Sequence, residues 1–457
     1  MKDLYIWKIK SKIMKRKRTG KSFYRSLLMV FLIGPYFSYA QIPQVSLPRP
    51  PSMPQYGIST NGNQSNTSQP PTTTHFNRVQ QQNEAIMREV QEHERLRQLQ
   101  TQEFIREAMA RDGVALPTFS DAPGTESFYA ARDEINDMLC GKRPLSLKRA
   151  VFLCENAYFD NRMSYDRFNA EIQNLKKICL LKLKEEGANS QDNMAKNLMI
   201  FRVITDEVSV KEPGTEKTLT HYPMKYDFED FYAREDLSKY MVSKLLVQNT
   251  GQCHSLPLLY LILAEELGAK AHLSLSPNHS FIKIQDNQGD WHSLELTRSA
   301  IATDDFYMGS GFIRSEALRN KLYLQPLSNK ELIAHSLNDL SKYYVSKYGY
   351  DEFVKQNADS VLSHFPTNLP AMQTISNYNT SIALYVLRQC NVPSPDDLPQ
   401  YPQANALYRQ MLEGYEKLDN LGYAEMPKEA YKEWLESLRV EKFDPENQPS
   451  IMIQTTK

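Results

Sequence analysis

Apolar residues recur at three- and four-residue steps over long stretches of this chain, which places them on one face of an α-helix. Between about Ser127 and Leu183 this spacing predicts several helices, and the helical run ends near Gly187. The pattern returns after Pro326 and continues to the end of "AYKEWLESLRVEKF". In the first stretch the expected core positions are Leu147, Val151, Cys154 and Tyr158, then Phe168, Ile172, Leu175, Cys179 and Leu183.

The pattern changes between Met194 and Gln325. A helix in "NMAKNLMIFRVITDEV" leads to a strand or hairpin in "KTLTHYPMKYDFED", and a short helix follows in "REDLSKYMVSKLL". The segment "HSLPLLYLILAEEL" is helical up to a cap at Gly268. The next segment, "AKAHLSLSPNHSFIKIQDNQGDWHSLELT", alternates like two strands joined by the turn "DNQGD". The chain is therefore expected to be α+β, with helices on both sides of a mixed central region.

The helices after Pro326 pair in a way that resembles one to three degenerate tetratricopeptide repeats. Large and small residues alternate, and a Pro-Thr-Asn turn separates two of the helical segments. Repeats of this kind leave a concave surface that suits a protein partner. Plain helix packing accounts for the same pattern, so both interpretations stand.

The amino-terminal part differs in composition from the rest. A basic segment containing "KRKR" precedes the apolar run "SLLMVFLIGPYFSYA", which is typical of a secretory signal peptide cleaved near Ala40. An uncleaved membrane anchor is the alternative, although Gly34 and Pro35 interrupt the run. Cleavage would leave a secreted or periplasmic protein of the cell envelope, with no membrane span. The predicted divisions are 1–40 signal peptide, 41–82 disordered Pro/Ser/Asn/Gln-rich linker, 83–190 helical region, 191–325 core and 326–457 helical, repeat-like region.

Charge and motif content exclude several classes of function. Lys and Arg together number 54 and so do Asp and Glu, so neither nucleic acid nor an anionic membrane is expected as the main partner. The segment "MGSGF" lacks the strand–loop–helix context of a phosphate-binding loop. His254, His272, His279 and His292 are not spaced like metal ligands. We therefore expect neither a metal nor another cofactor.

Cys253 is the cysteine with a distinctive setting among the five in the chain. It follows the polar turn "QNTGQ" and directly precedes the apolar helix, with Pro257 in the helix's first turn. The positive end of the helix dipole and its free N–H groups stabilise a thiolate at such a place. Cys154 and Cys390 occupy core-like helical positions, and pairings among Cys140, Cys154 and Cys179 stay open.

His279 and Glu295 supply the base and the acid that an activated thiolate requires. If the hairpin is centred near Asn287, the two residues lie directly opposite one another on neighbouring strands. The carboxylate would then orient the imidazole. Gln248 and Tyr226 are candidates for a second oxyanion donor beside the Cys253 backbone, and Trp291 is expected to pack in the core beside the site.

Together, "TGQC", the helix ending at Gly268, "PNHSFIKI" and "GDWHSLELT" resemble the core of the transglutaminase-like superfamily. The resemblance implies a papain-like helix packed on an antiparallel sheet, with Cys253 as nucleophile, His279 as base and Glu295 where the family has Asp. The wider chain, from about Leu145 to Leu438, is similar to bacterial proteins that join this core to tetratricopeptide repeats. Many of those proteins lack the cysteine.

The expected function is therefore an exported cysteine enzyme that hydrolyses or transfers an amide or peptide acyl group of a protein or peptide substrate. The alternative is a catalytically inactive scaffold of the cell envelope, which keeps the fold and binds a protein partner through its C-terminal helices. The presence of Cys253 favours the first.

Overall fold

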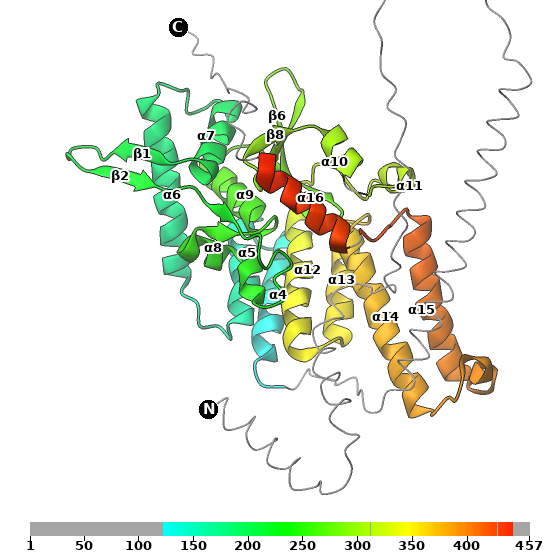
Figure 1. The fold of residues 1–457 in the computed structure, drawn as a ribbon. Helices are drawn as coiled ribbons and strands as arrows, with labels where there is room; N and C mark the ends of the chain where they lie inside the picture. Colours follow the sequence, from blue (N-terminus) through cyan, green and yellow to red (C-terminus); the bar gives the residue numbers. More distant parts are fainter. Residues whose placement is uncertain (1–121, 311, 427, 442–457) are drawn as a thin grey trace, which may run out of the picture.

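The computed structural model describes residues 122–310, 312–426 and 428–441. Within them the protein is mixed α+β and mostly helical, with a small antiparallel sheet and a helical C-terminal region (Figure 1). The predicted α+β class is confirmed. The predicted signal peptide and linker, and residues 83–121 of the predicted helical region, lie outside the described residues. Among the helices of the described ranges, none combines the length and the apolar character needed to cross a membrane.

The described chain opens with helices whose first turns are capped by short polar side chains. Ser146, Ser164 and Asp192 each accept a hydrogen bond from the backbone N–H three residues further along. The apolar positions predicted for this region are buried, except Tyr158, which is half-buried. The helices are α4 (Thr125–Leu139), α5 (Leu147–Tyr158), α6 (Tyr165–Glu185) and α7 (Asn193–Thr205).

Helix α9 (Ser255–Leu267) lies at the centre of the core. Every residue from Ser255 to Ala264 is buried, because this helix is apolar on all sides and other elements enclose it. Helices α5, α6 and α7 pack around it together with α8 (Val242–Gln248). It ends at Gly268, whose φ of 61° is the left-handed conformation that glycine adopts without steric cost.

The sheet contains more strands than the sequence suggested. In the described residues, β5 (His272–Ser276), β6 (His279–Gln285), β7 (Trp291–Glu295) and β8 (Ala300–Ala302) form a four-stranded antiparallel sheet in chain order. The segment predicted to be two strands is three, because Pro277 and Asn278 make a tight turn that pairs Ser276 with His279. Asn278 has a φ of 55°, which asparagine tolerates better than most residues.

Shorter elements lie on either side of this core. Strands β1 (Val208–Lys211) and β2 (Thr218–His221) form a hairpin that projects from the body (Figure 1). Strand β3 (Lys225–Tyr226) pairs in parallel with β4 (Thr250–Gly251). The remaining short elements are the 3₁₀ helices η2 (Leu237–Tyr240) and η3 (Pro395–Gln400) and the helices α10 (Asp304–Ser310) and α11 (Ser315–Arg319).

The C-terminal helices stack on one another in chain order and also on the N-terminal helices. Helix α12 packs on α13 and on α4 and α5, so a single hydrophobic core includes residues from 83–190, 191–325 and 326–457. The final helix, α16 (Lys428–Glu441), runs across the front of the molecule in Figure 1. The helices that stack before it are α12 (Asn329–Tyr348), α13 (Glu352–His364), α14 (Leu369–Gln389) and α15 (Pro402–Asn420).

Glu155 of α5 holds the start of α8, the helix that leads to Cys253. Its buried carboxylate accepts the backbone N–H of Val242 at 2.7 Å and that of Ser243 at 2.9 Å. These donors would otherwise be unsatisfied at the helix start. Burial nevertheless raises the pKa of Glu155 to about 7. A side chain remote in sequence therefore fixes the approach to the Cys253 turn.

Candidate active site

Cys253 lies where the chain passes from α8 to α9. Asn249 ends α8 in the left-handed conformation, with a φ of 50°, and β4 then pairs with β3 so that Gly251 lies beside Tyr226. The carbonyl of Gly251 accepts the backbone N–H of Asp227 at 2.8 Å. Cys253 follows within the turn that leads into α9, at the helix start where the sequence predicted it.

The thiol of Cys253 is enclosed by the turn between β5 and β6 and by the last helix. Cys253 is only 9% exposed. Sγ lies 3.8 Å from the carbonyl oxygen of Asn278 and 3.8 Å from the hydroxyl oxygen of Tyr431 in α16. The Ser280 hydroxyl donates to the Cys253 carbonyl at 2.5 Å, which ties the backbone of Cys253 to β6.

His279 and Glu295 form a buried pair. His279 Nε2 lies 2.6 Å from a carboxylate oxygen of Glu295, and each side chain is only 1% exposed. They are not directly opposite, as the sequence predicted: Ile282 pairs with Leu294, which by counting puts Phe281 opposite Glu295. The pair is diagonal instead. Because the offset is two residues, both side chains stay on one face of the sheet.

The register differs from the prediction because the loop is centred one residue later. The Asp286 N–H donates to the Asp290 carbonyl at 3.0 Å, which leaves Asn287, Gln288 and Gly289 as the loop. Gly289 has a φ of 92°, a conformation that favours glycine. The glycine thus selects a three-residue loop.

The carboxylate of Glu295 has further partners that compensate for its complete burial. One oxygen accepts the Thr297 backbone N–H at 2.8 Å, and the oxygen that contacts His279 also accepts the Tyr307 hydroxyl at 3.1 Å. Burial raises the pKa of this carboxyl. The charge of His279 and the bonds from His279 and Thr297 lower the pKa by more than burial raises it. The net pKa lies below the ordinary value, so Glu295 is held as a carboxylate.

The thiol and the imidazole shift each other's pKa in opposite directions. Burial raises the pKa of Cys253, but the charge of the neighbouring His279 helps to bring it below its usual value. Burial lowers the pKa of His279, but Glu295 and Cys253 raise it to about 10. Since Nε2 is occupied by Glu295, Nδ1 is the nitrogen left for the thiol. These directions favour a thiolate–imidazolium pair.

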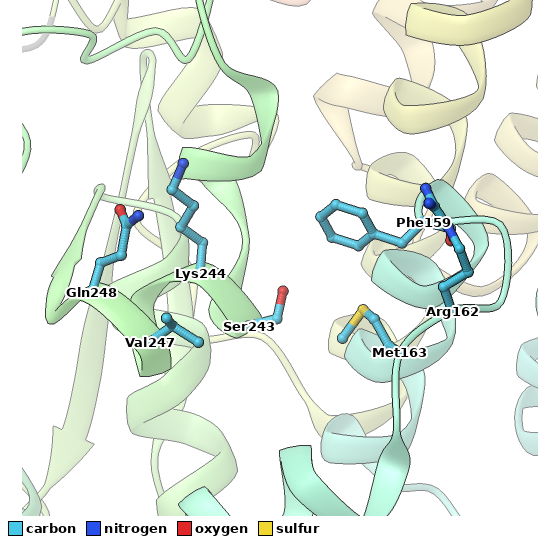
Figure 2. Close-up of a pocket in the computed structure, with 7 residues that line it drawn as sticks. All are labelled: Phe159, Arg162, Met163, Ser243, Lys244, Val247 and Gln248. Carbon is cyan, nitrogen blue, oxygen red and sulfur yellow. The ribbon is translucent and has the colours of Figure 1, made fainter. Parts of the chain in front are cut away.

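Gln248 does not join this cluster. It is exposed on α8 and lines a cleft of about 460 Å³. Figure 2 shows Lys244, Val247 and Gln248 on one side of this cleft, with Phe159 and Met163 on the other. The described contacts of Cys253 do not include Gln248. The residue lies on the face of α8 that is turned toward the loop after α5.

Tyr226, the other oxyanion candidate, is brought to the thiol. The β3–β4 pairing places it beside Gly251, and its side chain is buried. Its hydroxyl finds no well-formed hydrogen bond among the described residues. Burial raises the pKa of Tyr226, and the neighbouring Cys253 raises it further. A protonated hydroxyl therefore lies beside the sulfur, with Cys253 and Tyr431 as its neighbours.

Other aromatic residues lie where the sequence did not predict them. Trp291 was expected in the core but is 46% exposed, because the register directs it to the open side of β7, where its edge contacts His272. No sequence pattern indicated Tyr307, Tyr431 or Trp434, whose rings line the site. Tyr431 is 178 residues from Cys253, so no local spacing could have connected the two.

The histidines of this region are dispersed among separate partners. His254 Nε2 lies 3.2 Å from the Asp339 carboxylate, His272 contacts the Leu327 carbonyl at 2.8 Å, and His292 pairs with Asp286 at 2.8 Å. In the described part of the chain, His, Cys, Asp and Glu side chains form no group of three able to hold a metal ion.

Comparison with protein-family models, curated proteins and solved structures finds no match to this chain.

We expect Gly251→Ala to distort the site. An added Cβ would lie 2.7 Å from Ser255 Oγ and 3.0 Å from a methyl carbon of Leu245, and that Oγ accepts the Gln252 N–H at 3.0 Å. The substitution should lower the free energy of unfolding by about 1–3 kcal/mol. It should also move the pH midpoint of Cys253 alkylation toward that of an ordinary thiol. Denaturant melts and alkylation rates measured against pH check both effects.

Gly414→Ala in α15 is the matched control, because its Cβ meets Ser376 Oγ only at 3.4 Å within a regular helix. It should leave the pH midpoint of Cys253 unchanged. Wild-type behaviour of Gly251→Ala would show that the backbone at Gly251 does not position the thiol.

Proposed function

We propose that this protein is a cysteine-dependent acyl-transfer enzyme that acts on an amide bond of a protein or peptide. The observation that carries the proposal is the buried His279–Glu295 pair, 2.6 Å apart, beside a thiol whose pKa His279 lowers. A carboxylate on one ring nitrogen and a thiol near the other is the arrangement that activates a cysteine nucleophile.

The reaction follows from these positions. Cys253 Sγ attacks the carbonyl carbon of the amide, and the C–N bond breaks as His279 gives its proton to the departing amine. The acyl group is then held as a thioester. When water attacks the thioester, His279 takes a proton from it and the carbon–sulfur bond breaks, which restores the thiolate–imidazolium pair. An amine in place of water gives transfer instead of hydrolysis, and hydrolysis is the simpler outcome where water is abundant.

Tyr226 is the proposed donor to the oxyanion that forms on the substrate carbonyl. Its buried hydroxyl has no well-formed bond among the described residues and neighbours Cys253. A donor held ready in a site of low polarity stabilises developing negative charge without reorganisation.

The fold is consistent with the transglutaminase-like assignment. A buried helix that begins after the cysteine packs on an antiparallel sheet whose strands carry the histidine and the acid. The stacked helices α12 to α15 are consistent with repeats of the tetratricopeptide kind. The signal-like amino terminus supports export to the cell envelope.

The alternative function is a catalytically inactive scaffold. The observation that favours it is the burial of the thiol, since Cys253 is only 9% exposed. In that case the Cys–His–Glu cluster stabilises the fold, and the surfaces of the C-terminal helices bind a protein partner.

Cys253→Ala separates the two functions. The variant should keep its thermal unfolding midpoint and lose all measurable cleavage or deamidation of a mixed peptide library followed by mass spectrometry. Cys140→Ala, which removes an exposed thiol, should behave like the wild type. Equal turnover by Cys253→Ala and wild type would exclude Cys253 as the nucleophile. If the wild type modifies none of these peptides but retains a protein partner, the scaffold is favoured.

The dependence of thiol reactivity on pH tests Glu295. Because the pKa of Cys253 is lowered and that of His279 is raised to about 10, the alkylation rate should stay near its own maximum well below pH 9 and decline as pH falls through the lowered thiol pKa. Glu295→Gln removes the charge that raises the pKa of His279, so the midpoint should move up by about one pH unit or more. Glu171→Gln, on the exposed face of α6, should not shift it. An unshifted midpoint in Glu295→Gln would refute the orienting role.

Tyr226→Phe tests the oxyanion donor. Removing the hydroxyl should reduce kcat by about 10- to 1,000-fold with little change in KM, because the bond forms only as charge develops. Tyr222→Phe is the control, since Tyr222 is exposed in the same segment. A rise in KM alone would assign Tyr226 to substrate binding instead.

A further inference from the structure

The C-terminal helix α16 covers the Cys–His–Glu cluster. It crosses in front of the sheet and α12 in Figure 1, and its side chains reach the catalytic groups from the far end of the chain. Tyr431 and Leu435 on its inner face are buried, whereas Lys432, Glu433 and Glu436 on its outer face are exposed. The helix is therefore amphipathic, and its apolar face is the cover of the site.

Tyr431 fills the space directly over the thiol. Its hydroxyl donates to the Asn278 carbonyl at 3.0 Å and lies 3.8 Å from Cys253 Sγ. Its ring stacks on Tyr232, with centroids 5.3 Å apart, and meets Phe231 at 5.6 Å. Because the hydroxyl proton is directed to Asn278, this tyrosine is not free to act as an oxyanion donor. It occupies an aromatic slot beside the nucleophile.

Trp434 closes the other side of the cluster. Its indole meets the His279 ring edge-to-face at 4.8 Å and lies 6.3 Å from the Phe306 ring. Its indole N–H is buried without an acceptor among the described residues. A buried donor without a partner disfavours the docked position, because water would satisfy it once the helix moved away. The cover is thus held by aromatic packing and opposed by an unsatisfied polar group.

Access to the thiol requires this helix to move. Attack on an amide carbon brings the carbon within van der Waals contact of the sulfur, yet the side chains of His279 and Glu295 are 1% exposed and Cys253 is 9% exposed. Movement of α9 or β6 would break the buried core. Helix α16 adds Tyr431 and Leu435 to that core but leaves its other face in solvent, so it is the element that can leave with least loss of structure.

We propose that α16 is an autoinhibitory helix: Tyr431 and Trp434 block the Cys253 site in the resting protein, and displacement of the helix activates it. This inference rests on the proposed acyl-transfer function for its meaning, whereas the blocking itself is a property of access to the thiol.

The test compares two double variants in the full chain. Tyr431→Ala/Trp434→Ala removes the side chains that cover the site, and Lys432→Ala/Glu433→Ala alters the outer face of the same turn. Iodoacetamide modification of Cys253, followed on its own peptide by mass spectrometry, should be at least tenfold faster in the first variant and unchanged in the second. Turnover of the peptide library should rise in the same way. A first variant that folds, by circular dichroism and a cooperative melt, and reacts at the wild-type rate would overturn the proposal.

Hydrogen exchange of the wild-type chain tests the same idea without substitutions, which matters if Tyr431→Ala/Trp434→Ala does not fold. The amides of α16 should exchange at least tenfold faster than those of α9, because opening of α16 leaves the core intact. Equal protection of the two helices would overturn the proposal.

The outcomes keep this inference apart from the proposed function. Faster alkylation of Tyr431→Ala/Trp434→Ala with the pH midpoint of an ordinary thiol and no turnover would retain the cover and reject the enzyme. Rapid wild-type alkylation, a low pH midpoint and turnover that the variant does not increase would retain the enzyme and reject autoinhibition.

Discussion

The buried pair of His279 and Glu295 is the constraint on which the rest of this site depends. A carboxylate with no exposure to solvent is stable only if other groups replace the water it has lost. In this site the imidazole, the Thr297 N–H and the Tyr307 hydroxyl replace it. The diagonal contact across β6 and β7 is therefore one part of a larger arrangement, in which the end of β7 and helix α10 also have to be in place.

The surrounding helices fix Cys253 as firmly as the sheet fixes His279. Glu155 of α5 holds the start of α8, and Ser280 of β6 binds the carbonyl of Cys253. His254, the residue after Cys253, stacks on Tyr240 with ring centroids 3.7 Å apart and lies 3.2 Å from Asp339 of α12. The C-terminal helices are thus part of the support of the site rather than an appended module. Asp339 of α12 is connected to Cys253 through one residue, His254. The hydrophobic core that runs through all three segments links α12 to the site in the same way.

This support explains how a thiol with a lowered pKa and a closed site occur together. The elements that position Cys253, His279 and Glu295 are enclosed, whereas Tyr431 and Trp434, which pack on the same core, lie on a helix with one face in solvent. Burial of the thiol favours a scaffold if α16 is permanent and a regulated enzyme if α16 is removable. The docking of α16 over Cys253 therefore bears on both functions. The free-energy difference between the docked and the displaced helix decides between them.

The sequence by itself determined the helices, the mixed class, the helix start at Cys253 and the shared face of His279 and Glu295, because these follow from local periodicity, turn residues and capping. It missed the extra strand because the Pro277–Asn278 turn was not distinguished within an alternating run, and it placed the hairpin one residue too early because Gly289 selects the loop. Only the tertiary structure decided that Gln248 faces another cleft, that Tyr226 and Tyr307 join the site, and that α16 covers it. Those contacts join residues far apart in the chain through packing of side chains, and no local spacing encodes which distant ring fills a given space.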